Sequence, residues 1–194
     1  MLFFHTQNKL SDIRKDLILP EIGDLSNFGQ QNYLEIADQS YDIGTEDFSI
    51  STWVKTNSSS TQMLIQKGGL NGASDPQYWL RLNDQNGELI FLTGDGTLSS
   101  SFVSSQTPLD DNLWHHIVAK RIGNEISIYI DGEEDVTSQN PLQNCSNAQS
   151  VKIGVQIYNG NNNFLNGQIS GMRVYKSGLS AVQIKQLMAF TNPI

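Results

Sequence analysis

Two adjacent histidines, His115 and His116, are the residues whose types and spacing most readily suggest chemistry. Paired imidazoles could bind zinc, or one ring could act as a base beside a nucleophile. The surrounding residues alternate as in a β-strand, so the two side chains point to opposite faces and cannot bind one ion together. The third histidine, His5, lies far away in the sequence. We therefore expect the pair to be structural and predict no histidine-built zinc site.

Hydrolytic catalysis requires paired carboxyl groups or an activated nucleophile. The densest acidic run, Glu-Glu-Asp at 133–135, directly follows the turn residues 131–132, where a solvated turn is expected. The single cysteine, Cys145, has no histidine near it in the sequence. No glycine-rich phosphate loop precedes a helix. We predict that the chain is not an enzyme.

Two acidic loops match the ligand chemistry of calcium, which binds carboxylate and carbonyl oxygens. One loop carries Asp42 and Asp47, and the other carries Asp110 and Asp111. Acidic loops are also commonly solvated without a metal. A calcium site and a solvated loop both stay open as interpretations, and no other cofactor is indicated.

Aromatic, amide and charged side chains gather at two places in the sequence. Sugar binding uses aromatic rings that stack on the sugar and polar groups that bond its hydroxyls. The candidates are Asp75, Tyr78, Trp79, Arg81, Tyr158, Asn159 and Asn161. Strand alternation must bury either Tyr78 or Trp79, and Asn-Gly loops are ordinary turn chemistry. A glycan site and a purely structural role therefore both stay open.

Short alternating strands separated by turns must position these residues. Apolar and polar side chains alternate along residues 48–54 and 78–82, and residues 126–130 place three isoleucines on one face. The Asp-Gly pair at 131–132 supplies the positive φ angles that a two-residue hairpin turn requires. Repeated short strands without helical periodicity between them predict an all-β sandwich or barrel.

Helical periodicity is found near the two ends. Residues 1–26 carry Leu10, Ile13, Leu17 and Ile18 at helical spacing, which predicts a short amphipathic helix or an arm. Near the other end, Ser180 and Gln183 match a capping box ahead of an apolar stripe. We expect one short terminal helix over residues 181–190, packed on the sandwich.

Length and charge limit the classes of partner. The 194 residues suit one domain, and 12 basic against 20 acidic residues give a formal net charge of −8. Such a field repels a phosphate backbone, so nucleic acid is excluded as a partner. No apolar run approaches the roughly 20 residues that span a bilayer, so we expect no membrane insertion. The start of the chain lacks the continuous apolar stretch and cleavage site of a signal peptide.

The order of the segments resembles the laminin G-like branch of the concanavalin A-like lectin/glucanase superfamily, with its pentraxin-like relatives. The matching segments are Asn-Phe-Gly at 27–29, 32–36, 47–55, 64–68, 87–91, 113–118, 128–132, 151–154, 164–169, 174–175 and 179–180. The resemblance implies a jelly-roll sandwich of two antiparallel sheets over residues 27–194, with residues 1–26 as an amino-terminal arm. It also implies that the Trp-His-His segment is scaffold.

Two positions depart from the patterns of this superfamily. Related glucanases carry Glu-x-Asp-x-x-Glu on one strand, whereas Ser138 stands at the place of the last glutamate here. This argues against a glycoside hydrolase. Calcium-binding relatives offer an aspartate where this chain has Ser170, which argues against a family-type calcium site.

Three functions remain after these exclusions. We favour a structural or decorating subunit of a virion, of the bacteriophage type, or of another large surface assembly, with glycan adhesion as an added role. Virion proteins leave the cell by lysis, and residues 1–26 would then bind neighbouring subunits in an oligomer at the virion surface. The alternative is a free-standing lectin or adhesin, extracellular or on a cell surface, that binds cell-surface glycans with or without calcium. A glycoside hydrolase is the third function, and the chain lacks the carboxylates for it.

Overall fold

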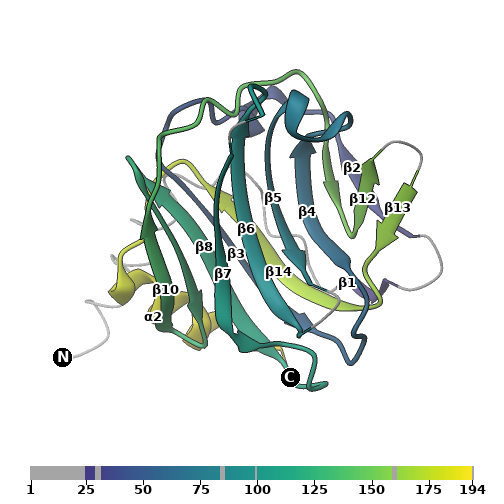
Figure 1. Ribbon diagram of the computed structural model, residues 1–194. Helices are drawn as coiled ribbons and strands as arrows, with labels where there is room; N and C mark the ends of the chain where they lie inside the picture. Colours follow the sequence, from purple (N-terminus) through teal and green to yellow (C-terminus); the bar gives the residue numbers. More distant parts are fainter. Residues whose placement is uncertain (1–24, 29–31, 84–85, 99, 159–160, 194) are drawn as a thin grey trace.

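Two six-stranded antiparallel sheets stack face to face in the computed structural model, which describes residues 25–28, 32–83, 86–98, 100–158 and 161–193 (Figure 1). In the first sheet the strand order is β1-β14-β3-β8-β9-β10, and in the second it is β2-β11-β4-β5-β6-β7. A separate hairpin, β12-β13, lies beyond β4 in Figure 1. The prediction of an all-β jelly-roll sandwich is confirmed.

The strands have the following bounds. The first sheet contains β1 (Leu25–Phe28), β3 (Phe48–Lys55), β8 (His115–Ile122), β9 (Glu125–Ile130), β10 (Glu133–Gln139) and β14 (Gly167–Tyr175). The second sheet contains β2 (Leu34–Ile36), β4 (Gln62–Gly68), β5 (Pro76–Leu82), β6 (Glu88–Asp95), β7 (Ser100–Pro108) and β11 (Val151–Ile153). The remaining elements are the hairpin strands β12 (Val155–Tyr158) and β13 (Asn161–Phe164), the short 3-10 turns η1 (Gln39–Tyr41) and η2 (Gly72–Ser74), and the helix α2 (Ala181–Thr191).

The hydrophobic core lies between the two sheets. Alternation places every second side chain of each strand on this inner face. The second sheet contributes Tyr78, Leu80 and Phe91, and the first contributes Ile117 and Ile128, all fully buried. The outer faces are therefore available for other contacts.

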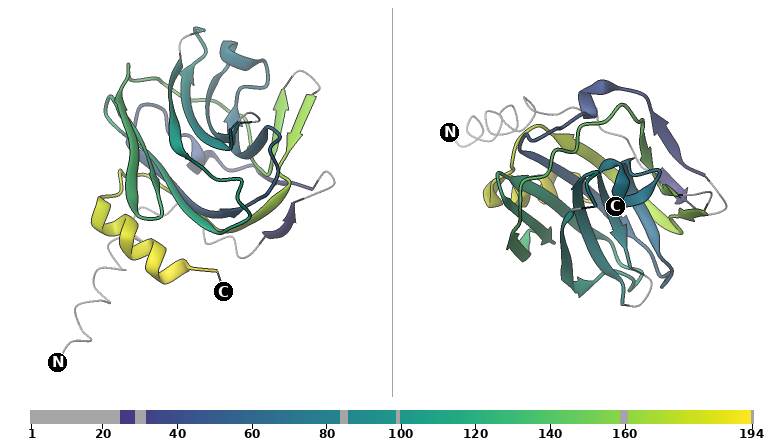
Figure 2. Two further views of the ribbon diagram at one scale, coloured as in Figure 1. Left: turned by 60° about the horizontal axis from the view of Figure 1, so that its bottom comes forward. Right: turned by 45° about the horizontal axis from the view of Figure 1, so that its top comes forward.

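The helix α2 covers the outer face of the first sheet. Its start has the expected capping box, in which Ser180 and Gln183 bond each other's backbone groups. Ile184 and Leu187 are buried in a second cluster with side chains of β8, β9 and β14. Figure 2 shows α2 and the β12-β13 hairpin on opposite sides of the sandwich. The helix thus lies on the outer face of the first sheet and not on the outer face of the second sheet.

The two ends of the chain differ in how far the structure describes them. The expected arm at 1–26 falls almost entirely on residues 1–24, which lie outside the described residues. Leu25 and Ser26, which we assigned to the arm, already belong to β1 and its pairing with β14. The terminal helix ends at Thr191, one residue beyond its expected end. None of the described helices is long and apolar enough to cross a membrane.

Candidate functional site

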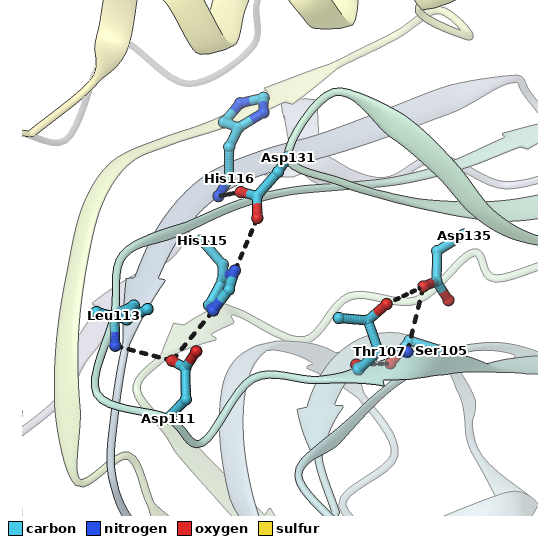
Figure 3. A network of polar contacts seen from close by, with 8 residues as sticks. All are labelled: Ser105, Thr107, Asp111, Leu113, His115, His116, Asp131 and Asp135. Atoms are coloured by element: carbon cyan, nitrogen blue, oxygen red, sulfur yellow. Dashed lines mark hydrogen bonds and ion pairs between the residues drawn. The ribbon is translucent and has the colours of Figure 1, made fainter.

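The two histidine rings lie on opposite faces of β8, as expected from strand alternation (Figure 3). His115 Nδ1 is 2.8 Å from Asp131 Oδ2, and its Nε2 is 3.1 Å from Asp111 Oδ1. His116 is 1% exposed, and its Nε2 lies 3.1 Å from Ser51 Oγ. Because the two rings have separate partners, they do not form a joint metal site.

The contacts of His115 make it a structural bridge. Asp131 lies at the turn after β9, and its other carboxylate oxygen accepts the backbone N–H of His116 at 2.9 Å. Burial lowers the pKa of His115, but the hydrogen bonds and charges of Asp131 and Asp111 outweigh burial, so the pKa is raised. Both ring nitrogens are occupied, which leaves neither to act as a catalytic base. This Asp111–His115–Asp131 bridge joins the β7–β8 loop to the β9–β10 turn.

The acidic run at 133–135 lies in the edge strand β10 rather than in a turn, which corrects the sequence-based expectation. Its three carboxylates have separate partners. Glu133 pairs with Lys185 of α2 at 2.7 Å, and Glu134 accepts the hydroxyl hydrogen bond of Tyr129 at 2.6 Å. Asp135 accepts backbone and hydroxyl hydrogen bonds from β7. The run therefore holds neighbouring elements together and offers no paired acid and base.

The calcium candidates lie at opposite ends of β8. Asp47 precedes the start of β3, which pairs with the end of β8, whereas Asp111 precedes the start of β8. Asp47 accepts the N–H of Gly123 at 2.7 Å. Asp110 lies beside Gly87, where an added Cβ would be 2.4 Å from its Oδ1. The two loops therefore cannot contribute to one metal site.

Asp42 lies in a polar pocket of about 360 Å³ that also contains Glu46 and Lys176. Its carboxylate accepts hydrogen bonds from the Ser146 hydroxyl at 2.7 Å and from the Asn147 N–H at 3.2 Å. The charge of Lys176 opposes a cation there. In the described part of the chain, no group of three or more His, Cys, Asp or Glu side chains is placed to hold a metal ion. Calcium binding stays a prediction.

A pocket of about 330 Å³ opens on the outer face of the second sheet. Its floor comes from β5 and β6, and its walls come from η2 and the β12-β13 hairpin. Among the described residues it is lined by Gly69, Gly72, Ala73, Gln77, Trp79, Arg81, Leu92, Ser100, Gln156, Tyr158 and Asn163. The pocket thus brings together three of the candidate sugar-binding residues, two of them from β5 and one from β12.

Alternation along β5 decides which of its residues reach this pocket. Gln77, Trp79 and Arg81 point outward and line it, whereas Tyr78 points into the core. Tyr78 is fully buried, and its hydroxyl donates to the Tyr41 carbonyl at 3.1 Å. The structure therefore removes Tyr78 from the candidate site.

Gln77 orients the floor of the pocket. Its Oε1 accepts the indole N–H of Trp79 at 3.0 Å, and its Nε2 donates to the Gly72 carbonyl at 3.0 Å. The guanidinium carbon of Arg81 lies 4.9 Å from the centre of the Trp79 ring, a cation–π contact. Trp79 is only 8% exposed. The indole therefore supports Arg81 and the pocket floor, and it offers little free ring surface to a ligand.

Tyr158 provides the exposed aromatic surface of the pocket. Its side chain is 39% exposed, and its ring lies against Gly72, where an added Cβ would be 2.8 Å from the ring. The hairpin that carries it is held over β4 because Gln66 Oε1 accepts the Ile157 N–H at 3.0 Å. Within the hairpin, Asn163 Nδ2 donates to Gln156 Oε1 at 2.6 Å. These contacts fix the wall before any ligand arrives.

The other candidates have different places. Asp75 does not line the pocket, and its carboxylate accepts hydrogen bonds from the backbone N–H of Asn71 at 2.9 Å and its side-chain amide at 3.0 Å. Asn161 lies in β13 in register with Tyr158, and Asn159 lies outside the described residues. Gln77 and Gln156 line the pocket but were not among the predicted site residues. Gln77 could have been found, since it lies two residues before Trp79 on the same strand face.

Comparison with known proteins places this geometry in a family context. A laminin G family model, described as the concanavalin A-like lectin/glucanases superfamily, matches residues 28–185. The core protein of a basement membrane-specific heparan sulfate proteoglycan from Mus musculus is 35% identical over 82 residues, which are 42% of this chain and 2% of that protein. The chain thus spans only a small part of this curated relative.

Several solved structures share the fold at low sequence identity. The Ruminococcus gnavus IT-sialidase CBM40 bound to sialyllactose has a TM-score of 0.72 and 16% identity, over 89% of this chain and 98% of that chain. Domains LG4-5 of the mouse laminin alpha1 chain have a TM-score of 0.65 and 17% identity, over 83% and 44%. A structure of botulinum neurotoxin type C, whose cell entry depends on interaction with two ganglioside molecules, has a TM-score of 0.65 and 13% identity, over 93% and 52%.

Proposed function

The chain belongs to the concanavalin A-like lectin/glucanase superfamily, and from this we propose that it is a non-catalytic carbohydrate-binding domain. The sugar lies in the pocket on the outer face of the second sheet. The observation that carries the proposal is the convergence of Trp79, Arg81 and Tyr158 with amide side chains in one preformed pocket. An aromatic wall beside fixed polar groups is the arrangement that orients a small polar ligand.

Each part of the pocket has a role in this proposal. Tyr158 packs against the apolar face of a sugar ring, because its ring is exposed and fixed by Gly72. The amide groups of Gln156 and Asn163 bond sugar hydroxyls. Trp79 holds the Arg81 guanidinium at the pocket floor. No large rearrangement is required, so little binding energy is lost to ordering the site.

We propose further that the bound glycan ends in a carboxylate-bearing sugar such as sialic acid. Arg81 is the one charged side chain among the described residues that line the pocket. A guanidinium group pairs with a carboxylate through parallel hydrogen bonds. Two solved structures of the same fold, a CBM40 bound to sialyllactose and a neurotoxin that interacts with gangliosides, support this choice of ligand.

The proposal is tested with a glycan array and then with titrations of sialyllactose and lactose into the purified chain. Sialyllactose should bind more tightly than lactose. Tyr158→Ala should weaken sialyllactose binding about three- to tenfold, the loss expected for one aromatic contact. Tyr33→Ala is the matched control, because Tyr33 is 44% exposed and does not line the pocket. Equal affinity of wild type and Tyr158→Ala for every captured glycan would place the site elsewhere.

Removal of calcium provides a second test. We expect glycan capture in EDTA to equal capture in calcium, because the described lining of the pocket contains no carboxylate. Loss of capture in EDTA would show that a metal contributes to binding and would direct attention to Asp42, Asp47, Asp110 and Asp111.

Binding to a glycan of this kind would place the chain at the surface of a cell or of a particle. The virion hypothesis is one form of this, in which the chain is a structural or decorating subunit and binds its neighbours through residues 1–26. That hypothesis stays a prediction, since residues 1–24 lie outside the described part of the chain. The carbohydrate-binding proposal stands without it.

A further inference from the structure

The outer face of β5, β6 and β7 carries a regular arrangement of polar and apolar side chains. Strand pairing places Trp79 beside Leu92, and Leu92 beside Phe102, in one row across the three strands. Residues paired across adjacent antiparallel strands share a face of the sheet. Trp79 and Leu92 already line the pocket, so its floor continues directly onto Phe102 at the edge strand.

Phe102 is a large, exposed side chain in this row. It is 57% exposed, while its neighbour Val103 points into the core and is 5% exposed. Two strand spacings separate Phe102 from Trp79, or about 10 Å. A single sugar ring that lies beside Trp79 would therefore not also stack on Phe102, whereas a disaccharide is about long enough to reach both.

Polar side chains flank both aromatic residues on the same face. On β5, Gln77 and Arg81 lie two residues before and after Trp79. On β7, Ser100 and Ser104 lie two residues before and after Phe102, and Ser100 also lines the pocket. A ring between two hydroxyl groups suits the apolar face and flanking hydroxyls of a sugar. A partner protein docking through a broad apolar patch would not require this alternation.

We infer that Phe102 is the stacking platform of a second sugar subsite, so that the ligand is an oligosaccharide running across β5, β6 and β7. This inference rests on the proposed carbohydrate-binding function. The terminal sugar occupies the pocket beside Tyr158. The following sugar residue packs on Phe102, with Ser100 and Ser104 bonding its hydroxyls.

The test compares a trisaccharide with its terminal monosaccharide. Sialyllactose and free sialic acid are titrated into the full chain and into Phe102→Ala. We expect Phe102→Ala to bind sialyllactose about three- to tenfold more weakly and to bind free sialic acid as the wild type does. Phe102→Trp, which keeps an aromatic ring, should retain the affinity for sialyllactose.

Phe190→Ala provides a matched control. Phe190 is 55% exposed, but it lies on α2, against the other sheet. This variant should bind both sugars normally, and melting temperatures should show that all variants are folded. In saturation-transfer NMR of wild-type protein, the second sugar ring of sialyllactose should receive saturation that Phe102→Ala no longer transfers.

The outcomes separate this inference from the function on which it rests. Unchanged sialyllactose affinity in Phe102→Ala, with normal wild-type binding, overturns the second subsite and leaves the pocket intact. Equal weakening of both sugars also overturns it, because Phe102 would then act on the pocket itself. If wild-type protein binds neither sugar, the proposed ligand class and this inference both fail.

Discussion

At the residue scale, two neighbouring histidines respond to acid in opposite directions. Burial lowers the pKa of His116 to about 4, so the folded protein keeps this ring neutral. The pKa of His115 is raised, so the folded protein favours its charged form. The folded state is therefore stabilised when His116 is neutral and when His115 is charged.

The first prediction concerns stability in acid. In the unfolded chain His116 takes up a proton near pH 6.5, whereas in the folded protein it does so only near pH 4. The free energy of unfolding should therefore fall as the pH drops between these values, by on the order of 3 kcal/mol from this residue. His116→Gln should remove this part of the acid sensitivity, as measured by urea unfolding at a series of pH values.

The second prediction concerns His115 at higher pH. Its folded-state pKa lies above 6.5, so its contribution to stability is complete below that pH and is lost as the pH rises through the raised pKa. His115→Gln should therefore destabilise the protein more at pH 6 than at pH 9. A stability difference from wild type that does not change between these pH values would contradict the charged bridge to Asp111 and Asp131.

The third prediction separates the two aromatic residues of the pocket. Trp79 is 8% exposed, so Trp79→Ala should lower the free energy of unfolding by about 3–5 kcal/mol and should also weaken glycan binding. Tyr158 is 39% exposed, so Tyr158→Ala should weaken glycan binding with a stability change of about 0.5 kcal/mol or less. Urea unfolding and titration of the same two variants would decide this. A stable Trp79→Ala variant would show that the indole does not support the pocket floor.

At the element scale, the two sheets are joined at one edge by a carboxylate. A register irregularity in β10 lies between Glu134 and Val136, at Asp135. The Asp135 carboxylate accepts the N–H group of Gln106 in β7 at 2.6 Å. It also accepts the N–H and the hydroxyl group of Thr107, at 3.2 and 2.6 Å (Figure 3). These N–H groups belong to an edge strand, where they could otherwise pair with another chain.

The fourth prediction follows from this contact. Asp135→Ala should lower the unfolding free energy by about 1–2 kcal/mol, because it removes charge-assisted hydrogen bonds to the backbone. It should also increase self-association through the uncovered edge, which sedimentation at several protein concentrations would measure. Glu133→Ala on the same strand is the control. Its ion pair with Lys185 is exposed and should contribute little.

At the scale of the whole molecule, the described sandwich has one outer face covered by α2 and one that carries the pocket. The fifth prediction concerns the rest of the chain. Removal of residues 1–24, which retains β1 from Leu25, should leave melting temperature and glycan binding unchanged. If those residues bind neighbouring subunits, light scattering should show that the assembly is lost. A truncated chain that keeps the mass distribution of the full chain would contradict the assembly hypothesis.

Much of this architecture follows from local sequence patterns. Alternation predicts that Trp79 and Arg81 share one face of β5. The Asp131-Gly132 pair predicts the hairpin turn between β9 and β10, where the φ angles are 51° and 85°. The Ser180 capping box predicts the start of α2 within one residue. These features depend on a few neighbouring residues, whose steric and hydrogen-bonding preferences act over a single turn or strand.

The sequence by itself thus determined the all-β class, which side chains share a strand face, and the terminal helix. Only the tertiary structure decided which face of β5 is buried and where the candidate site lies. Tyr158 and Trp79 are far apart in the sequence but line the same pocket, because Gln66 holds the β12-β13 hairpin over β4. Phe102 lies on the same face of the second sheet as Trp79, because β6 pairs with both β5 and β7. Local preferences do not specify which distant residues come together, because this depends on how separate strands pack and pair once the core has formed.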